Sequence, residues 1–249
     1  MLDFWSRVNN WYFYILSGIF ILAVILFFFL EKNKRKKPEY YLSFSLILLS
    51  VFYEYLAAAT VQFIEINKWL YGIFNYPQEN NYNLWVYNFF GYHITSLLFL
   101  ALIYHYLFSP LKKNIIKGLS LFFIFSYVIF QALGIESLFE QQTYSIFVGY
   151  SAVIIACGLY FMELISHPGY LEINPLKAFS FWQVTVILFN KSLKFLLEIS
   201  FNYIISVSMN LMSSLYLISK ITWILVLCSF LFTILLNTRF FKAKELSYE

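Results

Sequence analysis

The chain has few charged residues. Aspartate, glutamate, lysine and arginine make up 12% of the 249 residues, whereas 61% are hydrophobic and the mean hydropathy is +0.70. About a quarter of a soluble domain is charged, because polar groups must cover its surface. Too little polar surface is available here to cover a water-soluble globule of this size. The composition therefore predicts an all-α, polytopic membrane protein that forms a single domain over residues 1–249.

Signatures of catalysis and metal binding are scarce. Cys157 and Cys228 lie in apolar runs without the spacing of a metal or redox pair. Asp3 is the single aspartate, three histidines fall at different depths, and neither HExxH, GxSxG nor a glycine-rich phosphate loop occurs. These absences favour a non-enzymatic protein without a metal or cofactor. Basic residues concentrate in loops, which indicates membrane topology signals rather than a nucleic-acid surface.

Long apolar runs are what the sequence has instead. A hydrocarbon core of about 30 Å requires about 20 helical residues to cross it. Runs of that length exclude the strands of a β-barrel, and a helix satisfies its own backbone hydrogen bonds in lipid. The sequence therefore predicts a bundle of seven transmembrane helices, at residues 11–30, 41–64, 84–107, 118–134, 144–165, 179–207 and 211–236.

The basic residues are unevenly distributed between the two sets of connections. The connections on one side hold only Arg7 and Lys68. By the positive-inside rule, the richer side faces the cytoplasm, which places the N-terminus outside and the C-terminus inside. The basic residues of the richer side are Lys32, Lys34, Arg35, Lys36, Lys37, Lys112, Lys113, Lys117, Lys177, Arg239, Lys242 and Lys244. The longest outer connection, residues 65–83, predicts either an interfacial helix followed by a turn at 76–77 or a lid over an outward cavity.

The segment FNKSLKFLLEIS, residues 189–200, places ionisable residues inside an apolar run. Lys191, Lys194 and Glu198 follow i, i+3, i+7 spacing, which puts all three on one face of a helix. A charge at the bilayer centre costs at least about 2.5–3.5 kcal/mol, so three together require compensation. Lys194 and Glu198 can pair within the helix, which leaves Lys191 without a local partner.

Other predicted helices offer partners for the charged face formed by Lys191, Lys194 and Glu198. Glu54 is expected near the depth of Lys191, while His93 and Lys220 lie in the outer half, nearer Glu198. We infer a polar layer that runs from mid-membrane toward the outside, between the second, third, sixth and seventh helices. The candidate ligand-binding or ion-pathway residues are Glu54, His93, Lys191, Lys194, Glu198 and Lys220.

Each candidate also has a structural interpretation. Lys194 and Glu198 can form a pair that only holds helices together. Lys220 can extend toward the outer interface, and Glu163, at the inner end of the fifth helix, can do the same on its side. His93 is typical of a hydrogen-bonded core histidine.

Three functions differ in the residues that they require. A retinal photoreceptor requires a buried carboxylate counter-ion, and the third helix has none. A proton-coupled transporter or ion pathway, the alternative, favours helices interrupted by glycine or proline, which the sixth and seventh helices lack. The favoured function is a receptor-like or accessory bundle that binds a small anionic ligand or a lipid headgroup through Lys191 and Lys194. Such a bundle would signal to a separate cytoplasmic or membrane protein.

Two stretches carry a resemblance. YEYLAAATVQFIEINKWLYG followed by NNYNLWVYNFF, and NPLKAFSFWQVTVILFNKSLKFLLE, resemble a family of uncharacterised small multi-pass membrane proteins of Bacteroidetes-type bacteria. Glu54, Trp85, Tyr87 and Asn88 match recurrent positions of that family. The chain departs from the family pattern at His93, where a glutamate is common nearby, and in its sixth-helix lysines. The resemblance implies a seven-helix protein of the bacterial cytoplasmic (inner) membrane and supplies no activity.

Overall fold

The computed structural model describes residues 4–73, 84–171, 178–236 and 238. Every regular element within these residues is helical. Four basic residues used for the predicted orientation, and the predicted turn at 76–77, lie outside the described residues; the four are Lys177, Arg239, Lys242 and Lys244. The elements are α1 (Phe4–Val8), α2 (Trp11–Phe29), α3 (Lys32–Arg35), α4 (Pro38–Gln62), α5 (Ile64–Ile73), α6 (Leu84–Val86), the π-helix η1 (Tyr87–Ile94), α7 (Thr95–Tyr106), α8 (Pro110–Ala132), α9 (Thr143–Ser166), α10 (Pro168–Leu171), α11 (Phe179–Ile199), α12 (Phe201–Val207) and α13 (Met209–Leu236).

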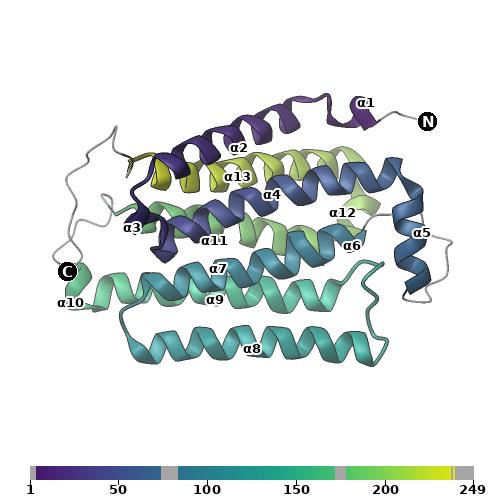
Figure 1. The fold of residues 1–249 in the computed structure, drawn as a ribbon. Helices are drawn as coiled ribbons and strands as arrows, with labels where there is room; N and C mark the ends of the chain where they lie inside the picture. Colours follow the sequence, from purple (N-terminus) through teal and green to yellow (C-terminus); the bar gives the residue numbers. More distant parts are fainter. Residues whose placement is uncertain (1–3, 74–83, 172–177, 237, 239–249) are drawn as a thin grey trace.

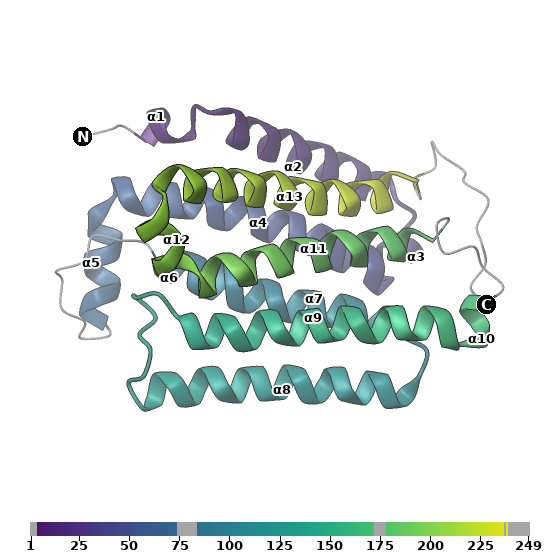
Figure 2. The ribbon, with the colours of Figure 1, turned by 180° about the vertical axis from the view of Figure 1, so that it is seen from behind.

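The long helices run side by side as a bundle, which both ribbon views show (Figures 1 and 2). Six of them are long and apolar enough to cross a membrane, and they confirm the prediction of an all-α, multi-pass membrane protein. These six are α2, α4, the continuous helix of α6, η1 and α7 (Leu84–Tyr106), α8, α9 and α13.

The seventh long helix, α11, lies beside α9 and α13 (Figure 2). Its 21 residues span about 31 Å at 1.5 Å per residue. Its polar and charged side chains make it less apolar than the other six. The predicted sixth helix, residues 179–207, was too long: α11 ends at Ile199, and α12 follows after Ser200. The Ser200 N–H donates to the Leu196 carbonyl, and its backbone (φ −93°, ψ 7°) leaves the helical region.

The predicted fourth helix, residues 118–134, began too late. In the structure α8 begins at Pro110, because proline suits the first turn of a helix. Lys113 and Lys117, expected in or at the end of a loop, therefore belong to this helix. Their ammonium groups each lie 5.4 Å from the ring centroid of Tyr104 on α7, a cation–π arrangement.

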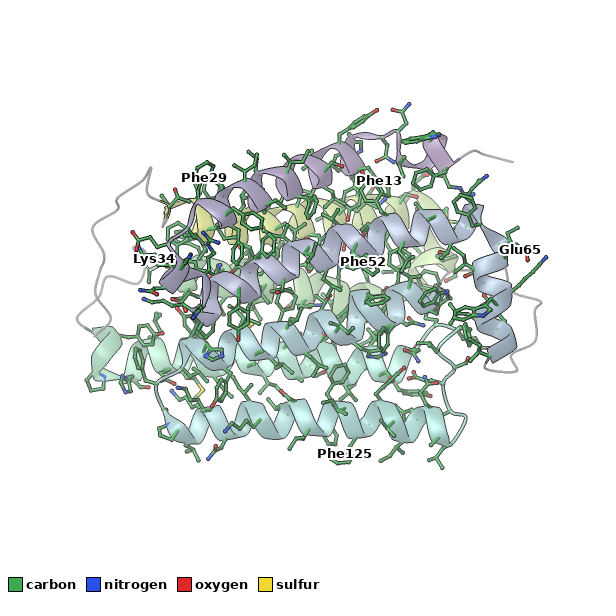
Figure 3. The ribbon with its side chains drawn as sticks, viewed as in Figure 1. Phe13, Phe29, Lys34, Phe52, Glu65 and Phe125 are labelled. Carbon is green, nitrogen blue, oxygen red and sulfur yellow. The ribbon has the colours of Figure 1, made fainter. Side chains whose placement is uncertain are left out.

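Apolar residues fill the centre of the bundle and also cover its outside. The central core combines α2, α4, α7, α9, α11 and α13, with Leu16, Leu46 and Phe99 fully buried. Large apolar side chains such as Phe125, 62% exposed, project outward from the bundle (Figure 3). A surface of this kind suits lipid, because lipid chains remove the cost of exposing apolar area to water.

The two ends of the bundle differ in charge. One end holds α3 with its basic residues, including Lys34, and the other holds α5, which lies across the bundle and carries Glu65 (Figures 1 and 3). We call them the α3 end and the α5 end. The exposed Trp69 on α5 fits an interfacial helix, since tryptophan favours that depth.

Candidate functional site

A π-helix organises one wall of the site. In η1 the backbone follows i→i+5 hydrogen bonding, which is rare and is frequent at functional sites. Its wide turn places Tyr87, Gly91 and Tyr92 on one side, where all three line a cavity. Gly91 faces α4, and a Cβ there would lie 3.7 Å from the Tyr53 ring, an ordinary van der Waals contact.

The cavity lies between five elements in the half of the bundle nearer the α5 end. Its volume is about 130 Å³, and we call it the inner pocket. It brings together four of the six predicted candidates, Glu54, Lys194, Glu198 and Lys220, although they come from three different helices. Its remaining lining residues are Tyr12 of α2, Tyr53 of α4, Tyr87, Gly91 and Tyr92 of η1, Leu197 of α11, and Tyr216, Ser219 and Trp223 of α13.

A larger, more open cleft of about 940 Å³ adjoins the inner pocket. Glu54 and Lys220 line both spaces, as do four tyrosines. The cleft extends to Arg7 near the end of α1, to Trp11 at the start of α2 and to Leu84 at the start of α6. The inner pocket therefore communicates with the α5 end rather than the α3 end.

Glu54 accepts hydrogen bonds from two tyrosines on neighbouring elements. The Tyr12 hydroxyl donates to Oε1 at 2.9 Å, and the Tyr87 hydroxyl donates to Oε2 at 3.3 Å. Sequence analysis missed Tyr12, because nothing local distinguishes it from the other aromatic residues near the start of α2.

Glu198 is held in a similar way. The Tyr92 hydroxyl donates to Oε1 at 3.3 Å, and the Gln141 amide donates to Oε2 at 3.1 Å. The pair predicted between Lys194 and Glu198 is not formed among the described residues, whose ion pairs lie elsewhere. Donors from η1 and from the connection before α9 occupy the carboxylate instead.

The two lysines of the inner pocket lie over aromatic rings. Lys194 Nζ is 4.7 Å from the Trp223 ring centroid, and Lys220 Nζ is 5.5 Å from that of Tyr12. Neither ammonium has a carboxylate partner within 4.0 Å in the part of the chain that the structure describes. The inner pocket thus holds two carboxylates and two ammonium groups that form no ion pair with one another within 4.0 Å.

Lys191 lies deeper and lines neither space. Its side chain is fully buried, and Nζ is 4.3 Å from the ring centroid of Tyr150 and 5.1 Å from that of Phe99. Nζ has no hydrogen-bond acceptor among the described residues. We expected Glu54 to meet Lys191, but Glu54 faces the inner pocket. The helix rotations that decide this pairing cannot be deduced from depth alone.

His93 lies on another side of η1. Its Nε2 is 2.6 Å from Gln142 Oε1, and its ring lies 4.1 Å from that of Tyr127 on α8. The structure therefore places it as a core histidine outside the inner pocket and the cleft.

Of the remaining residues that match the family pattern, Tyr87 lies in the inner pocket, whereas Asn88 and Trp85 hold neighbouring elements together. Tyr87 contacts Glu54 in the inner pocket. Asn88 donates to the carbonyls of Leu138 and Glu140 and so holds the connection between α8 and α9. Trp85 Nε1 donates to Asn67 Oδ1 at 3.0 Å, which ties α6 to α5.

Two buried carboxylates outside the site have structural roles that sequence analysis missed. Glu136 accepts from the backbone N–H groups of Tyr144 and Ser145 at the start of α9. Glu163 was expected to extend to the inner interface, but it is fully buried and accepts from the backbone N–H groups of Phe108 and Ser109 before α8. Both satisfy amides that precede or open a helix and lack intrahelical partners.

Among the described residues, no group of three or more histidine, cysteine, aspartate or glutamate side chains could hold a metal ion. No protein-family model, curated protein or solved structure matches this chain.

Proposed function

We propose that this chain is a seven-span protein of a bacterial inner membrane, and that its inner pocket and cleft bind a small polar ligand from the outside. In this role it acts as a receptor-like or accessory bundle and transmits binding to a separate membrane or cytoplasmic protein. One observation carries the proposal: two carboxylates and two ammonium groups surround one cavity that communicates with one end of the bundle. Buried ionisable groups inside a membrane tend to mark sites or pathways, because their burial is costly.

The length and packing of α11 support seven spans. Its 21 residues reach across the hydrocarbon core, and it lies alongside α9 and α13 (Figure 2). Trp182, Phe189 and Leu196 are exposed on one side, at intervals of seven residues. Lys191 is buried on the other side. Such a helix presents its apolar face to lipid and its charges to the interior.

The distribution of basic residues supports the orientation. Lys32, Lys34 and Arg35 lie in α3, and Lys113 and Lys117 lie at the same end of the bundle. The positive-inside rule then assigns the α3 end to the cytoplasm and the α5 end to the outside. The cleft accordingly opens outward.

Ion or proton passage remains the alternative function, because polar residues continue along α11 below the inner pocket. Asn190 donates to Thr222 Oγ1 at 2.8 Å, and Gln183 donates to Thr233 Oγ1 at 2.7 Å. Between these two pairs, however, lies a layer of fully buried apolar side chains: Val184, Ile187, Val226 and Leu227. A dry layer of this kind closes a pathway, so the geometry favours binding over passage.

Thiol accessibility tests the proposed site. In a background in which Cys157 and Cys228 are replaced by alanine, we compare Ser219→Cys, which lines the inner pocket, with Ser50→Cys. Ser50 is a matched control, since it is a buried serine one turn from Glu54 and lines neither space. A small charged methanethiosulfonate applied to intact spheroplasts should modify Ser219→Cys at least about tenfold faster, because a dry position reacts only through local opening. Equal rates at the two positions would contradict an outward-facing site.

A further inference from the structure

We infer that the ligand of this site is a zwitterion, a molecule that carries both an ammonium group and an oxyanion such as a carboxylate or a phosphate. This inference rests on the proposed function, because it assigns the chemistry of the ligand in the same cavity. It differs from the anionic ligand expected from the sequence, because Lys191 does not line the inner pocket and two carboxylates do.

The charge balance of the inner pocket is the first argument. Glu54 and Glu198 contribute two carboxylates, and Lys194 and Lys220 contribute two ammonium groups, so the ionised side chains sum to zero. A ligand with a net charge would add an unbalanced charge within the membrane, where the solvation cost of a charge is several kcal/mol. A zwitterion adds none.

The separation of these charges is the second argument. The carboxylates receive hydrogen bonds from tyrosines and from Gln141, and the ammonium groups lie over the rings of Trp223 and Tyr12. Each ammonium has three donors, and each carboxylate accepts about four hydrogen bonds, so both signs of charge have unused capacity. An anion alone would satisfy only the lysines, and an amine alone only the carboxylates.

The aromatic lining is the third argument. Tyr53, Tyr92 and Tyr216 line the inner pocket together with the two carboxylates, and ring faces attract an ammonium group when water is excluded. The ammonium of the ligand would therefore lie between Glu54 and Glu198, and its oxyanion would contact the two lysines.

The adjoining cleft is compatible with two kinds of zwitterionic ligand, a lipid and a free, water-soluble molecule. Its wall includes the apolar residues Phe13, Ala57, Ala58, Val61 and Leu217. It therefore offers space for the apolar part of a zwitterionic lipid as well as a route for a free, water-soluble zwitterion. The two sources are separated by experiment.

The test uses the Ser219→Cys protein in nanodiscs that contain only the anionic lipid phosphatidylglycerol. Three soluble probes are compared at equal concentration: glycerophosphoethanolamine, which is zwitterionic, glycerol phosphate, which is anionic, and ethanolamine, which is cationic. We expect glycerophosphoethanolamine to slow thiol modification at least about tenfold and the other two probes to have little effect. Equal or greater protection by the anion or the cation would overturn the inference.

A second set of nanodiscs distinguishes the sources. If phosphatidylethanolamine in the bilayer slows modification without any soluble probe, the zwitterion is a lipid headgroup. If only the soluble probe slows it, the ligand is a free zwitterion. If neither does, the zwitterion inference is wrong. The proposed function would survive that result, because it depends on rapid modification of Ser219→Cys without any probe.

Charge-changing variants sharpen the test. Glu54→Gln leaves the inner pocket with one excess positive charge and should shift its preference about tenfold toward glycerol phosphate, since the ligand's ammonium group loses a charged hydrogen-bond acceptor. Lys194→Gln should shift the preference toward ethanolamine by a similar factor. Glu65→Gln is the control, because Glu65 is exposed on α5 and lines neither space. An unchanged order of the three probes in both variants would overturn the inference.

Discussion

Replacement of Glu163 by alanine is expected to lower the free energy of unfolding by about 3 kcal/mol, because removal of one partner from a buried charged network leaves the others uncompensated. Glu163 Oε1 accepts the backbone N–H groups of Phe108 at 2.5 Å and Ser109 at 2.7 Å. Lys112 Nζ lies 3.6 Å from Oε2. The carboxylate therefore joins the end of α9 to the chain segment that opens α8.

Two further variants separate this role from a general effect of mutation. Glu163→Gln keeps one carbonyl oxygen as an acceptor and should cost less than the alanine variant. Glu65→Ala removes an exposed carboxylate and should stay within about 0.5 kcal/mol of the parent protein. In a background in which the half-buried Cys228 is replaced by alanine, unfolding is followed in mixed micelles by reaction of the buried Cys157 with a fluorogenic thiol reagent. A loss below about 0.5 kcal/mol in Glu163→Ala would contradict the assigned role.

Replacement of Lys191 by methionine is expected to stabilise the protein by about 1–4 kcal/mol, the range measured when well-packed hydrophobic residues replace buried ion pairs, because the change leaves no partner charge behind. Lys191 is fully buried, and its Nζ finds no acceptor in the described part of the chain. The rings of Tyr150 and Phe99 recover about 2 kcal/mol of the desolvation cost, which leaves a net cost for the ammonium. Methionine fills a similar volume without a charge.

Lys194→Met is the matched control for this variant. Lys194 lies one turn further along α11, and its ammonium faces the inner pocket rather than the core. We expect no gain in stability there. The midpoint of thermal unfolding is measured for both variants with the same thiol reagent. A lower midpoint in Lys191→Met would show that the amine makes a favourable interaction, and would contradict the description of Lys191 as an unpaired lysine.

The helical, multi-pass architecture could be predicted because the length of an apolar run relates directly to bilayer thickness. The ends of the helices were less predictable. The break at Ser200 lies in a run without glycine or proline, and the start of α8 at Pro110 precedes three lysines that indicate a loop. At Ser200 no such residue marks the break, whereas Pro110 is a local signal for the start of α8, because proline suits the first turn of a helix, and the lysines that follow obscure it.

In the candidate site too, some features follow from the sequence and others do not. The face shared by Lys194 and Glu198 follows from helical periodicity, so the sequence indicates it directly. Their partners do not follow, because they depend on the rotation of each helix about its own axis. The π-helix adds a further uncertainty. It changes the rotation of Tyr87 and Tyr92 relative to His93, and Gly91, the glycine in its sequence, indicates a candidate break there without indicating a π-helix.

The central claim is that the ionisable pocket opens outward, and its most direct test is the sidedness of thiol modification. Right-side-out and inside-out vesicles that carry Ser219→Cys are treated with the same impermeant methanethiosulfonate. The structure and the positive-inside rule predict rapid modification in right-side-out vesicles and little in inside-out vesicles. Faster modification in inside-out vesicles would reverse the assigned orientation. Equally slow modification in both would show that the pocket is closed to water.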